Sequence, residues 1–243
     1  MIWRLLLVLM ISTAVAGCGA GSAAIAPLPY APAGATWTYL VTETPPGGSS
    51  TTSTTTLVYK GVSGYRGSSY QLFEDTNNSS PGITERIYMV WDGSLARIKA
   101  ELLTDGTTTI ELVFDKTWVL NQTAESTSGT VQRYLNGTFV DAIPWSVSTS
   151  DGGIVAVIVP AGSFTTRRWD GIVDVGGPQP YSSYTSAHTE IKRQFTSVSS
   201  GTQVIFELTS GEALSLTSRP ATEATATTLL LKFSDLKKQL KIR

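Results

Sequence analysis

Alternating apolar and polar residues dominate the chain from Thr36 onwards. In the first such segment Trp37, Tyr39 and Val41 share one face, and threonines occupy much of the other. A period of two is typical of a strand with one buried face. The pattern predicts an all-β domain of roughly ten to thirteen strands. Similar alternation recurs in four later segments: 87–91, 96–102, 110–114 and 204–208.

Turn-forming dipeptides separate many of these segments. Asp-Gly and Asn-Gly supply the positive φ angles that tight hairpin turns need. We therefore expect an antiparallel meander that forms a strongly curved half-barrel or a β-sandwich. Alternation places Ile98, Ala100 and Leu102 on one face of their strand. The run Ile154–Val159 is apolar at every position, so both of its faces are expected to be covered. Seven dipeptides carry the turn signal: Asp92-Gly93, Asp105-Gly106, Asn136-Gly137, Asp151-Gly152, Asp170-Gly171, Ser200-Gly201 and Ser210-Gly211.

Composition changes after this body. We expect one all-β domain at 36–218, followed by a linker rich in Ala and Thr at 219–228. The final segment, 229–243, has five basic residues against Asp235. Its apolar residues have helical spacing, so one prediction is a short amphipathic helix on anionic lipid or on the acidic body of the protein. A strand at 227–233 with a polar end, or disorder, are the alternatives.

Residues 1–17 have the layout of a secretory signal peptide, with a positive Arg4, an apolar run and then small residues. The apolar run is too short for a spanning helix. Val15-Ala16-Gly17-Cys18 resembles the lipobox of bacterial lipoproteins. In that family the cysteine thiol receives a diacylglyceryl group and the chain is cut before it. The resemblance implies lipidation at Cys18, the one cysteine of the chain; an ordinary secretory signal is the alternative.

The lipoprotein resemblance also implies a location. The mature chain would start at Cys18, and 18–35, rich in Ala, Gly and Pro, would be a flexible tether. Two or three acyl chains on one cysteine give stable anchoring in a membrane. Gly19 follows the cysteine, whereas an Asp there favours the inner membrane in these lipoproteins. The expected place is the cell envelope, on the periplasmic face of the outer membrane where one exists.

A second resemblance rests on two motifs in the body. Trp37-Thr38-Tyr39 opens it, and Val159-Pro-Ala-Gly-Ser-Phe164 follows the long apolar run. They are similar to periplasmic lipoprotein domains of unknown function with strongly curved antiparallel sheets, loosely similar to the carriers LolA and LolB. This implies binding of a lipid or hydrophobic ligand on the concave face. The alternative is a structural or assembly lipoprotein that binds another envelope protein, which an exposed apolar patch without a cavity would favour.

Pro160 to Gly162 also has a physical interpretation of its own. Proline cannot donate a ladder hydrogen bond and glycine permits a bulge, so the strand is expected to turn sharply there.

Charge and composition exclude several classes of function. The chain has 243 residues, 15% of them charged, and a net charge of -1, which argues against nucleic acid as a partner. One cysteine excludes a disulfide framework, and one histidine excludes a multi-histidine zinc site. We therefore expect no cofactor.

Candidate catalytic residues do not form a motif. His188 has no Gly-x-Ser-x-Gly nucleophile elbow to serve. Paired carboxylates can hydrolyse glycosides, but none of the carboxylate candidates lies in a motif. Asp170 and Asp174 have the wrong spacing for a calcium-binding loop. We expect a protein without catalytic or metal-binding residues. The carboxylate candidates are Glu74, Asp75, Glu85, Asp170 and Asp174.

Aromatic residues are the remaining candidates. On a curved sheet they either fill the core or line a cavity for lipid or sugar, and we favour the core. The aromatic side chains concerned are Trp37, Trp91, Trp118, Trp145, Trp169, Tyr181 and Tyr184.

Overall fold

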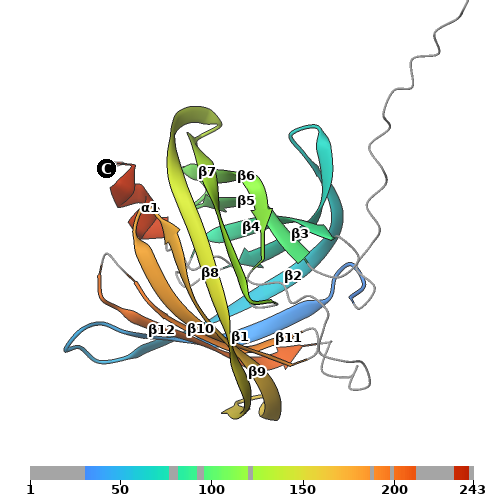
Figure 1. The fold of residues 1–243 in the computed structure, drawn as a ribbon, viewed down its shortest axis with the longest axis vertical. Coiled ribbons are helices and arrows are strands. Elements are labelled where there is room, and N and C mark those ends of the chain that lie inside the picture. Colours follow the sequence, from blue (N-terminus) through green and yellow to red (C-terminus); the bar gives the residue numbers. More distant parts are fainter. Residues whose placement is uncertain are drawn as a thin grey trace, which may run out of the picture.

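Twelve antiparallel strands close into a single barrel in the computed structural model of the chain (Figure 1). The structure describes residues 31–76, 82–91, 96–119, 123–186, 189–197, 200–211 and 233–240. The strands are β1 (Thr36–Thr44), β2 (Thr51–Tyr65), β3 (Ser68–Thr76), β4 (Thr84–Trp91), β5 (Ala96–Thr104), β6 (Thr109–Trp118), β7 (Glu125–Leu135), β8 (Thr138–Val159), β9 (Gly162–Val175), β10 (Pro178–Ser186), β11 (Thr189–Thr196) and β12 (Gln203–Gly211). One short helix, α1 (Phe233–Gln239), follows them.

Closure of the sheet goes beyond either predicted shape. The all-β antiparallel meander is confirmed, but one continuous sheet replaces the half-barrel or sandwich because β12 returns to pair with β1. The register runs from Trp37 opposite Gly211 to Thr44 opposite Gln203. Bulges such as the one between Tyr59 and Gly61 of β2 increase the local twist that a closed sheet needs.

Apolar side chains point into the barrel because they occupy alternate positions of each strand. In β1 Trp37, Tyr39 and Val41 are buried, and their neighbours are half-buried. Aromatic and branched side chains fill the interior. The largest fully buried side chains are Trp118, Tyr59, Phe73, Phe114, Ile87, Met89, Ile98, Leu103, Ile110, Leu112 and Ile191.

Three of the predicted turns are hairpin turns in the structure. Asp105-Gly106 connects β5 to β6, Asn136-Gly137 connects β7 to β8, and Ser200-Gly201 connects β11 to β12. Asn136 and Gly137 have φ angles of 50° and 78°, so both adopt the left-handed conformation that a tight hairpin demands. Pro160 and Ala161 form the sharp turn between β8 and β9, as predicted. Asp92-Gly93 lies outside the described residues.

Three predicted turns are wrong, because their dipeptides lie inside strands. Ser210-Gly211 forms the last two residues of β12, where it pairs with Thr38 and Trp37 of β1. Asp170-Gly171 is in the middle of β9, paired with β8 and β10. Asp151-Gly152 belongs to β8, where the register shifts between Asp151 and Ile154 and Gly153 has a φ of 81°. An Asp-Gly pair followed by another glycine suits a bulge as well as a turn, and here both sides continue to pair with β9.

The strand beyond this bulge forms the structure that we call the ribbon, residues 154–166. Its turn reaches across to β12, where the Ala161 amide donates to the carbonyl oxygen of Leu208 at 3.0 Å. The ribbon thus folds over one end of the barrel, the ribbon end (Figure 1). The expectation that Ile154–Val159 is covered on both faces is wrong: Val159 is buried, but Ile158 is 78% exposed.

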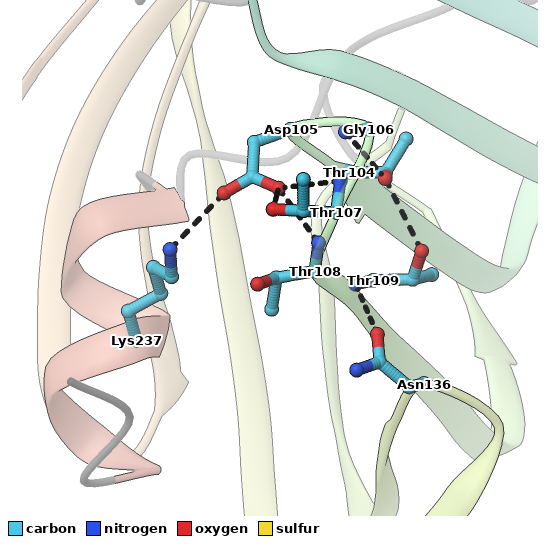
Figure 2. Close-up of polar contacts among 8 residues, drawn as sticks. All are labelled: Thr104, Asp105, Gly106, Thr107, Thr108, Thr109, Asn136 and Lys237. Atoms are coloured by element: carbon cyan, nitrogen blue, oxygen red, sulfur yellow. Dashed lines mark hydrogen bonds and ion pairs between the residues drawn. The ribbon is translucent and has the colours of Figure 1, made fainter.

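Helix α1 packs at the opposite end of the barrel. Leu236 is fully buried in the main hydrophobic core, and Lys237 donates to Asp105 of the β5–β6 turn at 3.0 Å (Figure 2). Arg133 donates to the Gln239 side chain at 3.2 Å. Of the alternatives for the basic tail, the described part is a helix that lies on the protein's own body.

The Asp105 turn is held tightly. The backbone amides of Thr107 and Thr108 donate to its Oδ1 at 2.9 and 2.7 Å (Figure 2). Together with the Lys237 ammonium group these donors hold the pKa of Asp105 well below its usual range.

Within the described ranges, no helix combines the length and apolar character that a membrane span requires.

Candidate functional site

The two residues that most directly implied a function lie outside the described residues. Cys18 and His188 both fall there, so lipidation of Cys18 stays a prediction, and so does the absence of a catalytic role for His188. The five carboxylate candidates are all described.

Only two of these carboxylates come together. Asp75 of β3 and Glu85 of β4 are directly opposite in the register, and both point into the barrel with 1% and 0% of their surface exposed. Glu74 points outward and accepts from Arg86 at 2.9 Å. Asp170 and Asp174 lie on β9, far along the ring, so the sequence candidates do not form one site.

A third interior carboxylate, Glu101 of β5, was not among the candidates. It is fully buried, and it interacts with Glu85 across the β4–β5 pair. Neither Glu101 oxygen accepts a hydrogen bond from the described residues. Burial raises the pKa of Glu101 well above its ordinary value, and the negative charge of Glu85 raises it further. The pair therefore retains a proton to a higher pH than an isolated glutamate does.

Asp75 lies in the same interior cluster. The Thr55 hydroxyl donates to its carboxylate. Burial raises the pKa of Asp75 to about 6, although the Thr55 hydrogen bond and the positive charge of Arg193 act in the opposite direction.

Arg193 of β11 is the basic partner of this cluster. It lies 3.6 Å from Glu190 as an ion pair with both side chains 3% exposed, and its guanidinium group lies 4.4 Å from the centre of the Phe206 ring. Ser183 also donates to the Glu190 carboxylate, and Tyr39 donates to the Glu190 carbonyl oxygen at 3.2 Å. Burial raises the pKa of Glu190. The positive charge of Arg193 and the Ser183 hydrogen bond act in the opposite direction, but burial outweighs them.

The chemistry open to this cluster is limited by its burial. Each of its acids is no more than 3% exposed. A glycosidase needs its two carboxylates on either side of an accessible bond. This cluster can store a proton and hold strands together, but it does not present the carboxylates to a sugar. Within the described ranges, no group of three or more His, Cys, Asp or Glu side chains is arranged to hold a metal ion.

The aromatic candidates belong mainly to the core, as we favoured. Trp37, Trp118, Trp145 and Trp169 are no more than 6% exposed, and Trp91 packs against the same core. Phe114, Trp118 and Trp145 contact one another with ring centres 5.1 to 5.9 Å apart. Tyr181 is also buried, and its hydroxyl lies 2.7 Å from that of Thr149. Tyr184 is half-buried.

Two hollows on the outer surface are candidate binding sites. The larger has a volume of about 570 Å³ and crosses β7, β8 and β9. Its lining includes three serines, Ser126, Ser148 and Ser150, together with Asp170 and the half-exposed Ile172. Ser126 is opposite Ser148 and Ser148 is opposite Ile172, so they form one row across the outer face. We call this the serine hollow.

The second hollow is smaller, about 160 Å³. It is lined by Pro180–Ser182, Gln194–Thr196 and Gln203, from β10, β11 and β12.

The serine hollow adjoins a break in the strand pairing. β6 pairs with β7 only from Val131 to Leu135. Beyond that point side chains of β6 replace the ladder: Asp115 accepts from the Thr130 amide at 2.9 Å, and Lys116 donates to the Ser128 carbonyl oxygen at 2.9 Å. The first half of β7 is thus joined to β6 by side chains rather than by backbone hydrogen bonds.

Asp115 is the central group of this break. Besides Thr130, it accepts from the Lys116 amide at 2.9 Å and from the Trp145 indole at 3.1 Å. Partial desolvation raises the pKa of Asp115, but the three hydrogen bonds and the positive charge of Lys116 outweigh it and lower the pKa.

Comparisons with known proteins leave the family open. No family model matches the chain, and no curated protein matches it. One solved structure that does match is the crystal structure of a "putative lipoprotein" from Parabacteroides distasonis. It is 8% identical, with a TM-score of 0.36 over 76% of this chain and 97% of that chain. A similarity of this size is too low to transfer a fold or an activity.

Proposed function

We propose that this protein is anchored in the bacterial envelope through a lipid on Cys18 and that it binds another envelope protein on its outer surface. It carries out no catalysis. The observation that carries this proposal is the barrel interior, which is filled by side chains. The lipobox at Val15–Cys18 supplies the anchoring part of the proposal.

The filled interior favours a protein partner over a carried ligand. A carrier of lipid needs an apolar cavity, commonly 300 to 1,000 Å³. In this barrel the concave face, which was the expected binding surface, is occupied by residues such as Trp118, Phe114 and Tyr59, all less than 2% exposed. α1 packs at one end and the ribbon folds over the other.

The serine hollow is the part of the outer surface that best fits a partner. It has hydroxyl groups that both donate and accept, the Asp170 carboxylate, and the apolar Ile172 at its edge. An extended polypeptide offers matching amide and carbonyl groups. The neighbouring half of β7, which has no backbone pairing with β6, can extend such an interface.

Two measurements test this proposal. A native mass spectrum of the mature protein should show no stoichiometric ligand after incubation with envelope lipids. A photo-reactive amino acid at Ser148 should crosslink one discrete envelope protein, and the same group at the exposed Thr52 of β2 should not. Ser126→Arg, which places a long side chain in the hollow, should abolish the crosslink.

The alternative function has a distinct result. A lipid that is bound in stoichiometric amount and released by extraction would support the ligand carrier and contradict the filled interior. Anchoring is tested separately: the acyl chains should be found on Cys18 by mass spectrometry and should be absent from Cys18→Ser.

A further inference from the structure

The ribbon has an unusual outer face. From Ile154 to Thr166 it contains no charged residue, and the charged residues nearest in sequence are Asp151 and Arg167 at its base. Ile154 and Ile158 are 76% and 78% exposed, the highest values among the exposed large apolar residues of the described chain. Exposed Ala156 lies between them on the same face. Isolated exposed apolar residues are common, but an uncharged hairpin with two isoleucines on its outer side indicates a contact surface.

The inner face explains why these isoleucines cannot simply turn inward. Val159 is buried in the barrel core, and Val157 and Phe164 pack against the same core. Since successive residues of a strand point to opposite faces, Ile154 and Ile158 are fixed on the outside. The contact surface is therefore held in place by the packing beneath it.

The ribbon lies at the end where the chain enters the barrel. Ala161 bonds to Leu208, and Leu208 is opposite Tyr39 near the start of β1. Ala31 and Ala35, which precede β1, belong to the same core as Val159. Thirteen residue steps separate Cys18 from Ala31. At full extension they span about 45 Å, so a lipid on Cys18 keeps this end within about that distance of the membrane.

We propose that the outer face of the ribbon, Ile154, Ala156 and Ile158, rests on the surface of the lipid bilayer in which the protein is anchored. This proposal rests on the anchoring at Cys18 proposed above. The chain length and its point of entry bring the ribbon to the bilayer, and the two isoleucines insert their side chains among the headgroups and the first acyl carbons. A weak apolar contact of this kind adds to the anchor and orients the barrel.

The charges near the ribbon suit this orientation. Arg167 and Asp151 neutralise each other at the base of the ribbon, with nitrogen-to-oxygen distances of 2.5 to 3.1 Å. When the ribbon approaches the bilayer and water is displaced, each charge of this pair still has its partner. The cost of burying an unpaired charge is therefore avoided. The basic helix α1, which the sequence had offered as the lipid contact, lies at the other end, where Lys237 pairs with Asp105. The membrane contact is thus assigned to the ribbon.

A fluorescence experiment on the full mature lipoprotein tests the proposal. Lipidation uses the Cys18 thiol, so Ile158→Cys introduces the one free thiol for an environment-sensitive dye. Val140→Cys is the matched control, since Val140 is 43% exposed, apolar, and on β8 near the α1 end. Both proteins are placed in vesicles of phosphatidylethanolamine and phosphatidylglycerol. We expect nitroxide lipids to quench the dye at 158 and iodide in the water to quench it at least about threefold less than at 140.

Three results would overturn the proposal. Equal quenching at the two positions would mean that the ribbon does not touch the bilayer. Stronger iodide quenching at 158 would mean that it faces the water. Protection from iodide in the Cys18→Ser, Ile158→Cys chain without vesicles would mean that another part of this chain or a second copy covers the face.

Failure of anchoring has a separate signature. If mass spectrometry finds no acyl chain on Cys18, the proposed function fails. The ribbon is then tested with the Cys18→Ser chain held at its N-terminus by a histidine tag on vesicles with nickel-chelating lipid. The same contrast between positions 158 and 140 supports the ribbon contact, and its absence contradicts it.

Discussion

The carboxyl groups of Glu85 and Glu101 interact on adjacent strands inside the barrel, and both residues are completely buried. Two carboxylates at such a site repel each other unless one carries a proton. Because the pKa of Glu101 is raised in the folded protein, the folded state binds protons more strongly than the unfolded chain does. The free energy of unfolding should therefore fall as the pH rises above the ordinary glutamate value of 4.5.

We expect Glu101→Gln to stabilise the protein at pH 8 by about 1–3 kcal/mol and to reduce this pH dependence. The amide nitrogen of the new side chain donates to Glu85 without the need for a proton. Urea unfolding at pH 5, 6.5 and 8 measures the effect. A variant that loses stability equally at all three pH values would contradict the shared proton.

Glu74→Gln is the control for the sign of this effect. Partial burial raises the pKa of Glu74, but Arg86 and Lys60 outweigh it and lower the pKa. Its carboxylate therefore contributes stability that is present above the ordinary glutamate value and is lost as the pH falls. Glu74→Gln should lose stability at pH 8, opposite in direction to Glu101→Gln.

Leu236 holds α1 on the barrel. Its side chain is fully buried in the main core, and Leu236→Ala should lower the free energy of unfolding by about 2–4 kcal/mol. Lys238 is exposed, so Lys238→Met should change it by less than about 0.5 kcal/mol. Thermal or urea unfolding distinguishes the two. If both variants are equally stable, the helix does not contribute to the barrel.

Glu101 shows where alternation in the sequence stops predicting the fold. The pattern placed Ile98, Ala100 and Leu102 on one face, and β5 would obey it if the register were regular. A bulge between Ile98 and Ala100 reverses the alternation. Ala100 therefore joins an outer cluster with Leu72 and Tyr88, and Glu101 turns inward.

Other features were predictable because their causes are local. Alternation with a period of two predicted the strands. Asn136-Gly137 predicted a hairpin turn, because both residues tolerate positive φ angles. Asp151-Gly152 has the same local signal but forms a bulge, since the pairing with β9 continues beyond it. The serine hollow depends on three strands that are brought together only in the folded sheet, and no local pattern marks it.

Gly171 is required by a close approach between neighbours. A β-carbon added there would lie 2.4 Å from the Ser148 carbonyl oxygen and 2.7 Å from the Tyr181 ring. Gly171→Ala should therefore destabilise the barrel by about 1–3 kcal/mol. Gly64→Ala on β2, where nothing lies within 4 Å, is the matched control and should be close to neutral. Equal midpoints of thermal unfolding would contradict the crowding at Gly171.

Arg66 fastens the turn of the β2–β3 hairpin to the outer wall of the barrel. It donates to Glu111 of β6 at 2.9 Å, and its guanidinium group lies 3.9 Å from the centre of the Tyr134 ring on β7. Arg66→Ala should increase amide hydrogen exchange at residues 65–68 about three- to tenfold, because a contact of about 1 kcal/mol is lost. Lys60→Ala, six residues earlier and within β2, should leave this exchange unchanged. No change with Arg66→Ala would contradict a stabilising role for this contact.

The pairing of β1 with β12 has a consequence for the order of assembly. Every other strand pair in the described ring joins neighbours in sequence, so these ladders can form in succession as the chain is made. The last ladder joins Trp37 to Gly211, and it must wait for nearly the whole chain. Until β12 is available, β1 has one open edge along which another strand can pair. If the chain is exported as proposed, the interval before β12 pairs with β1 is the period of greatest exposure to misassembly, and ring closure ends it.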